Sequence, residues 1–152
     1  MKGKRGPLTV LKYPGGHGKG MTAARYQKQV LEKLVHDFYM EASEERGWVL
    51  FEQDRAPSHR AKSTINWLKQ NSVETMPHPA ASPDVVPIEP LWHNLKEHIR
   101  AQSHIPTTLD ELKSAIYEAW DQLTVEDVDR HAKTMEERVQ AVLQAKGGHT
   151  QY

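Results

Sequence analysis

The chain has 152 residues, no cysteine, and 20 basic against 20 acidic side chains. This length is typical of one domain with its own core, and the charge balance gives no general attraction to nucleic acid or to a membrane surface. The absence of cysteine excludes a disulfide scaffold and a thiolate zinc site, and no apolar run approaches the roughly 20 residues of a membrane span, so we expect a soluble intracellular protein.

The first 20 residues are expected to be a flexible linker that contains one short strand remnant. Glycine and proline are dense here and leave room for a single extended piece at 8–13. The glycine run at 15–20 lacks the Gly-Lys-Ser/Thr ending of a phosphate-binding loop. We therefore interpret 1–20 as a strand remnant and linker, and 21–152 as one domain.

Apolar periodicity in 21–152 predicts an α/β order of elements. Short buried strands are predicted at 48–51 and 73–76, the first covered on both faces because its apolar run is unbroken. Helices are predicted at 23–42 and 58–70, from Glu89, after Thr108, and from Thr124 to Gly147. Thr108 and Glu111 have the spacing of a capping box.

Two carboxylates occupy positions where chemistry is often found. Asp54 follows the strand 48–51, and Glu89 lies in the first turn of a helix. The 34 residues between them leave room for a helix and a strand, so both side chains can return to one edge of a sheet, where open α/β sheets place their ligand sites. Taken alone, an aspartate at a turn and a glutamate in a first helical turn are also ordinary placements.

The sequence around both carboxylates resembles a known family. The block Phe51 to His59, Phe-Glu-Gln-Asp-Arg-Ala-Pro-Ser-His, resembles the second-aspartate motif of the Tc-one/mariner superfamily of DNA transposases. The block from Ser82 to Lys96 resembles its third-carboxylate motif, and the ending 138–152 is similar to the usual family terminus. Glutamate in the third position points to the Tc-one branch.

The resemblance implies a ribonuclease H-like fold with a helical C-terminal part, and metal-dependent DNA cutting and joining. Two Mg²⁺ or Mn²⁺ ions about 3.5–4 Å apart would activate the attacking oxygen and stabilise the leaving one. By resemblance, Asp54 is the second ligand of these ions and Glu89 the third. The implied partner is transposon-end DNA, and the implied location is the nucleus.

The first aspartate of the family has no counterpart at a strand end. Asp37 is the one aspartate before Asp54, and it lies within the predicted helix 23–42. We therefore expect a truncated catalytic domain that lacks the first strands and is inactive alone. Residues 8–13 are expected either to pair with 48–53 or to make no stable contact with the rest of the chain.

Basic side chains near the two motifs are candidates for contact with DNA. They are Arg55, His59, Arg60 and Lys96. Arg55 stands where the family usually has asparagine, and it can pair with Asp54 or touch a phosphate. Solvated helix faces explain these cations equally well, and Asp84 is interpreted as a turn-former.

Three hypotheses follow from this pattern. The first is an inactive transposase fragment that holds two of three metal ligands and retains nucleic-acid binding. The second is a non-enzymatic module that pairs with DNA or with full-length transposase through an exposed strand edge. The third is a longer chain that carries the first aspartate upstream of Met1.

Overall fold

The structure, a computed structural model, describes residues 3–12, 20–79, 82–146 and 148–152. The chain divides into two compact units. We call Thr9–Ala81 the α1–α4 unit, and Met1–Leu8 with Ser82–Tyr152 the α5–α8 unit. The last residue of the predicted strand 8–13 and the glycine run at 15–18 lie outside the described residues.

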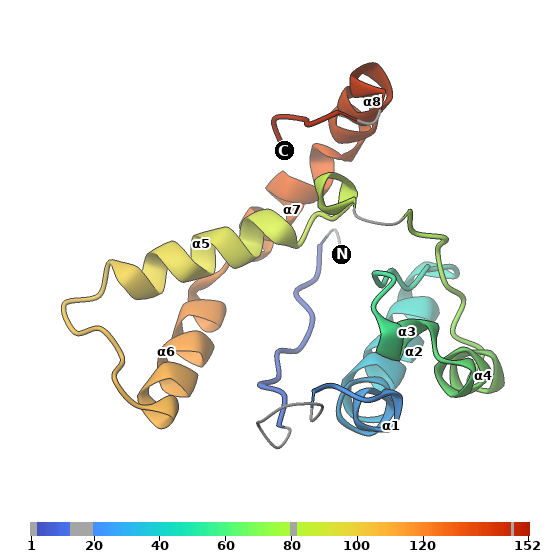
Figure 1. Cartoon of the computed structure of the whole chain (residues 1–152), viewed down its shortest axis with the longest axis horizontal. Helices are drawn as coiled ribbons and strands as arrows, with labels where there is room; N and C mark the ends of the chain where they lie inside the picture. The colour runs from blue at the N-terminus through green and yellow to red at the C-terminus, as the bar shows by residue number, and fades with distance from the viewer. Residues whose placement is uncertain (1–2, 13–19, 80–81, 147) are drawn as a thin grey trace. The chain divides into compact units, whose positions relative to one another are not determined.

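A long helical segment runs through the α1–α4 unit. It comprises α1 (Ala23–Tyr26), a π-helix η1 (Gln27–Val35) and α2 (His36–Arg46), as Figure 1 shows. The predicted helix 23–42 is therefore confirmed, and it continues to Gly47, whose left-handed φ of 76° ends it. The expected apolar stripe is the core face, because Tyr26 and Leu31 pack with Leu68 and Val73.

Two shorter helices complete this unit. They are α3 (Pro57–Arg60) and α4 (Lys62–Gln70). The predicted helix 58–70 is thus interrupted at Ala61, whose ψ of 137° is extended. α1 contacts both α3 and α4, and α3 begins three residues after Asp54.

The predicted strands 48–51 and 73–76 are wrong as ladder members, because the described residues form only one isolated parallel bridge, Phe51 with Thr75. The Phe51 N–H donates to the Glu74 carbonyl at 2.8 Å, and the Phe51 carbonyl accepts from Met76 at 3.0 Å. The Tyr39 hydroxyl takes the place of the next ladder bond: it accepts from the Glu74 N–H at 3.0 Å and donates to the Val49 carbonyl at 3.1 Å. A side chain of α2 therefore separates the two segments.

The expected burial of 48–51 on both faces is also wrong. The Trp48 residue is 64% exposed and Leu50 is 37% exposed. Alternate residues of an extended segment point to the same side, so Trp48 and Leu50 share one uncovered face. The Trp48 indole N–H donates to the Glu74 carboxylate at 3.0 Å, which the unbroken apolar run did not indicate.

The α5–α8 unit is helical throughout its regular structure. The 3₁₀ helix η2 (Pro83–Val85) precedes α5 (Glu89–Arg100), α6 (Leu109–Gln122), α7 (Val125–Lys133) and α8 (Met135–Ala145). α5 and α6 pack side by side (Figure 1), and Leu95, Ala119 and Trp120 form their core. The predicted capping box of Thr108 and Glu111 is confirmed.

The last predicted helix, 124–146, is divided by Thr134 into α7 and α8. Apolar spacing predicts Val128, Val139 and Leu143 on the inner face of this helix. Val128 is buried, whereas Val139 is 42% and Leu143 is 64% exposed. Arg138, a charged residue, takes the buried position on α8 with 5% exposure. Apolar spacing therefore identified α8 but placed its buried face wrongly.

The described residues of the N-terminal segment do not pair with 48–53, and they do make contacts with the rest of the chain. Leu8 packs against the α5–α6 core, and the Arg5 guanidinium donates to the carbonyl oxygens of Trp120 and Leu123 at the end of α6. In the other unit, the Lys12 backbone exchanges two hydrogen bonds with the Gln29 side chain, at 2.8 and 2.6 Å. The Gln29 side chain thus takes both backbone groups of Lys12, which a sheet would have used.

Candidate metal and nucleic-acid site

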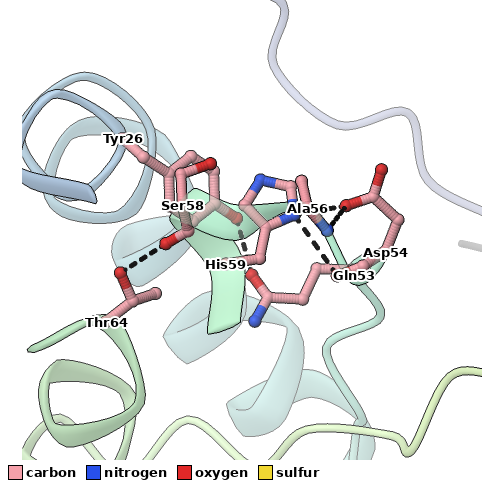
Figure 2. Close-up of polar contacts among 7 residues, drawn as sticks. All are labelled: Tyr26, Gln53, Asp54, Ala56, Ser58, His59 and Thr64. Carbon is pink, nitrogen blue, oxygen red and sulfur yellow. Dashed lines mark hydrogen bonds and ion pairs between the residues drawn. The ribbon is translucent and has the colours of Figure 1, made fainter. Parts of the chain in front are cut away.

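Asp54 lies three residues after the bridge residue Phe51, at the entry to α3. Its side chain is 66% exposed, and its Oδ1 accepts from the Ala56 N–H at 2.8 Å (Figure 2). This bond between a carboxylate and the amide two residues later is an Asx turn, which reverses the chain before Pro57 begins α3. The turn fixes the direction of the carboxylate and leaves most of it open to solvent.

The His59 side chain contacts Asp54. The His59 Nδ1 atom lies 2.6 Å from Asp54 Oδ1, and 3.3 Å from the Asp54 carbonyl oxygen. The His59 ring also rests on the Tyr26 ring, with centroids 4.2 Å apart (Figure 2). His59 is therefore held between an aromatic side chain and the carboxylate, and its side chain is only 20% exposed.

Further hydrogen bonds hold Asp54 and His59 in this arrangement. The Tyr26 hydroxyl donates to Gln53 Oε1 at 2.8 Å, next to Asp54 (Figure 2). The Thr64 hydroxyl donates to the Ser58 carbonyl at 2.7 Å and accepts from Gln27 Nε2 at 3.1 Å. These bonds connect the long helical segment, α3 and α4 around one carboxylate.

The surroundings of Asp54 favour its ionised form. The Ala56 N–H lowers the pKa of the Asp54 carboxyl most, partial burial opposes this, and the charge of His59 lowers it further. Burial raises the pKa of the Tyr26 phenol strongly, and the Asp54 charge adds to that rise. Asp54 is therefore a carboxylate, and Tyr26 a neutral hydrogen-bond donor.

A second carboxylate–imidazole pair was missed by the sequence reasoning. His78 Nδ1 lies 3.0 Å from Glu52 Oε1, and the His78 side chain is only 4% exposed. Glu52 is two residues before Asp54, so the two side chains leave the extended segment on the same side. The alternation of side chains along the segment was the sequence signal that could have placed Glu52 beside Asp54. The charge of His78 also lowers the pKa of the Asp54 carboxyl.

Glu89 is the first residue of α5, with Pro90 second, as the sequence predicted. It is exposed, and its N–H donates to the Val86 carbonyl at 3.2 Å. Asp54 belongs to the α1–α4 unit and Glu89 to the α5–α8 unit. Each carboxylate thus presents itself to solvent from its own unit.

The remaining acidic candidates have structural roles. Asp84 lies in η2, as expected of a turn-former, and its Oδ2 accepts from the Thr150 hydroxyl at 2.7 Å. Asp37 lies in the first turn of α2 with an 83% exposed side chain beside His36. Neither residue adds a candidate metal ligand beside Asp54.

Three of the four predicted DNA-contacting side chains, Arg55, Arg60 and Lys96, are exposed, whereas His59 is largely covered. Arg55 precedes α3, Arg60 is the last residue of α3, and Lys96 lies on α5. The segment 55–71 contains four lysines and arginines and no acidic residue, so its local charge is positive although the chain is neutral. Such a patch attracts phosphate backbones.

The donor chemistry suits a hard divalent cation in part. Within the described ranges no group of three or more histidine, aspartate or glutamate side chains is arranged to hold a metal ion. Mg²⁺ is commonly bound through one or two carboxylates, with water and substrate phosphates as the other ligands. Asp54 and Glu89 each present an exposed carboxylate, and each fits that partial role within its own unit.

Comparison with known proteins identifies the class of this arrangement. The family model described as DDE superfamily endonuclease matches residues 15–113, more than half of the chain. The transposable element Tcb2 transposase of Caenorhabditis briggsae is 27% identical over 159 residues, covering 98% of this chain and 56% of that protein. The chain thus spans little more than half the length of this relative.

Solved structures support the same class. The crystal structure of the catalytic domain of Mos1 mariner transposase, from a protein of Drosophila mauritiana, matches with a TM-score of 0.73 and 25% identity, over 88% of this chain and 66% of that one. The Mos1 mariner paired end complex with Mn matches with a TM-score of 0.71 and 25% identity, over 88% of this chain and 39% of that one. The ribonuclease H-like relationship is therefore shown, although the described residues of this chain form no strand ladder.

Proposed function

Since the chain belongs to the DDE superfamily endonuclease family, we propose that it carries the second and third metal-binding carboxylates of a transposase catalytic domain, Asp54 and Glu89. The 152-residue polypeptide binds the phosphate backbone of DNA. On its own it does not cut the DNA. The observation that carries this proposal is the family match, which spans both carboxylates within residues 15–113. A nuclear location follows from DNA as the partner.

The two carboxylates contribute to one divalent-cation site. A bound Mg²⁺ or Mn²⁺ pair would activate the attacking oxygen and stabilise the leaving oxygen of a phosphodiester. The Ala56 N–H and His59 keep the Asp54 carboxylate ionised and fix its direction. With two of the three carboxylates that the family uses, this polypeptide retains weak cation binding and lacks the ligand set for strand cleavage.

His59 serves as a positioning residue for Asp54. Its Nδ1 faces the carboxylate at 2.6 Å, and its ring is fixed against Tyr26. His59→Asn keeps a polar side chain and removes the ring that rests on Tyr26, so it tests this positioning role.

The metal claim is tested by isothermal titration of the polypeptide with Mn²⁺. We expect weak binding in the wild-type chain, a loss of at least tenfold in affinity in Asp54→Asn and Glu89→Gln, and no change in Asp37→Asn. Equal Mn²⁺ affinity in all four proteins would contradict the assignment.

The phosphate-binding claim rests on the positive segment around α3. Each Lys or Arg contact to a phosphate adds about 0.9 to the slope of log affinity against log salt concentration. Arg55→Ala with Arg60→Ala is therefore expected to weaken binding to duplex DNA and to lower the slope by about 2. Fluorescence anisotropy at several salt concentrations measures both, with Lys133→Ala on α7 as the control cation.

The inactivity claim is tested with transposon-end DNA and Mg²⁺ or Mn²⁺. We expect no strand cleavage by the 152-residue polypeptide. Cleavage that disappears in Asp54→Ala would overturn the claim of inactivity while supporting the role of Asp54.

A second candidate function is association with full-length transposase. The exposed, apolar face of Trp48 and Leu50 favours it, because this extended segment has one bridge and an uncovered side. Co-elution of the chain with a full-length relative in size-exclusion chromatography, lost in Trp48→Glu, would support it. Separate elution of the wild-type chain removes its main support.

A further inference from the structure

Arg138 carries a buried charge, and its contacts have no part in the function proposed above. Arg138 on α8 is 5% exposed, and a buried guanidinium is tolerated only where its donors find acceptors. Its Nε donates to the Thr134 hydroxyl at 2.9 Å, and its Nη1 donates to the carbonyl oxygen of Asp84 at 2.9 Å. Arg138 thus attaches α8 to η2.

The C-terminal tail makes a second attachment to the same turn. α8 ends at Lys146 with a left-handed φ of 48°, and the Gly148 N–H donates to the Ala145 carbonyl at 2.8 Å. The tail then returns, so that the Thr150 hydroxyl donates to Asp84 Oδ2 at 2.7 Å. The backbone and the carboxylate of Asp84 are therefore each held, one by Arg138 and one by Thr150.

The last residue covers this arrangement. The Arg138 guanidinium lies over the Tyr152 ring, 4.6 Å from its centroid, and the Tyr152 N–H donates to the Thr150 hydroxyl at 3.2 Å. An arginine over an aromatic face is stabilised by the ring electrons. Tyr152 therefore orders Thr150 and Arg138 together.

The attached turn leads directly to Glu89. The Val86 N–H donates to the Pro83 carbonyl at 2.9 Å, and the Glu89 N–H donates to the Val86 carbonyl at 3.2 Å. Two consecutive hydrogen-bonded turns therefore link Asp84 to the first residue of α5. Moving Asp84 would move the start of α5 and the carboxylate it carries.

We propose that Gly148–Tyr152 and Arg138 form a latch on η2, in which Thr150 and Arg138 are positioning residues for Glu89. The latch contacts neither metal nor DNA and acts by restricting the backbone from Asp84 to Glu89. It rests on the proposed function only in giving Glu89 a ligand role, and its test uses neither ligand.

The test is amide hydrogen exchange measured by NMR on the full chain. Thr150→Val removes the donor to Asp84 and keeps the shape of the side chain, and Thr150→Ser restores a hydroxyl. We expect the Val86 and Glu89 amides to exchange about tenfold faster in Thr150→Val and Tyr152→Ala. Thr150→Ser and Gln151→Ala, a tail substitution outside the latch bonds, should exchange like the wild type.

Amides of α6 report on folding of the same unit and should exchange unchanged in every variant. The proposal is overturned if Val86 and Glu89 exchange at the same rate in Thr150→Val as in the wild type. It is equally overturned if α6 loses protection in parallel, since the tail would then stabilise the whole unit and not this turn. Failure of Mn²⁺ binding with an intact latch would count against the proposed function alone.

Discussion

At the scale of single residues, Thr64 carries much of the support beneath Asp54. It is fully buried, and its hydroxyl links the Ser58 carbonyl to the Gln27 side chain. Thr64→Val leaves that carbonyl without its donor, and a buried unsatisfied group costs about 1–3 kcal/mol. We expect urea unfolding of the α1–α4 unit to show a loss in this range.

Thr64→Ser is the matched control for this prediction. It keeps the hydroxyl and removes one methyl group, which costs about 1 kcal/mol. A larger loss in Thr64→Ser than in Thr64→Val would mean that packing, and not the hydrogen bonds, makes Thr64 important.

The positions of the two candidate ligands could be read from the sequence, but their surroundings could not. Glu89 lies in the first turn of α5, as predicted, whereas Asp54, predicted at the end of a buried strand, follows a single isolated bridge. The ion pair with His59 depends on the Asx turn and on the Tyr26 ring, which lies on a helix far away in the chain. Tertiary contacts of that kind leave no local pattern to read.

At the scale of elements, the capping box of α6 gives a pH dependence. The Thr107 N–H, the Thr107 hydroxyl and the Thr108 N–H lower the pKa of the Glu111 carboxyl from 4.5 to about 2. A lowered folded-state pKa stabilises the fold above the unfolded pKa, and this contribution is lost as the pH falls from about 4.5 to about 2. NMR titration of the carboxyl should therefore show a midpoint near the lower value.

Glu111→Gln provides the comparison in unfolding experiments. Wild type should be the more stable protein at neutral pH, and the two proteins should converge as the pH approaches 2. A difference that stays constant down to that pH would contradict the role of the Glu111 charge.

Gly47 tests how α2 ends. Its φ of 76° is left-handed, and a Cβ atom placed there would meet nothing within 4 Å. Gly47→Ala is therefore expected to destabilise through the backbone alone, by about 1–2 kcal/mol in chemical denaturation. Gly20→Ala, also in open space, is the control and should change stability less.

Helices were predictable because their signals are local, whereas the strands were not. The stripe from Tyr26 and the caps at Thr108 and Thr124 identified helices that the structure contains. The segments 48–51 and 73–76 had the composition of strands, but the Tyr39 hydroxyl takes the backbone groups between them. A hydroxyl delivered by another element is invisible to a composition argument.

At the scale of the whole molecule, each unit has its own core. Leu31 is fully buried in the α1–α4 core, and a buried Leu→Ala change costs about 2–5 kcal/mol. Leu31→Ala should therefore lower hydrogen-exchange protection in α2 and leave the α6 amides unchanged. Equal losses in both helices would show that the two units unfold as one.

The central proposal is that Asp54 and Glu89 are both metal ligands of a transposase catalytic domain, and paramagnetic NMR with Mn²⁺ tests it most directly. We predict that amide signals next to both residues broaden along one titration curve, and that Asp54→Asn weakens the broadening near Glu89 as well. Broadening near only one of them, or two curves that Asp54→Asn leaves independent, would contradict the claim.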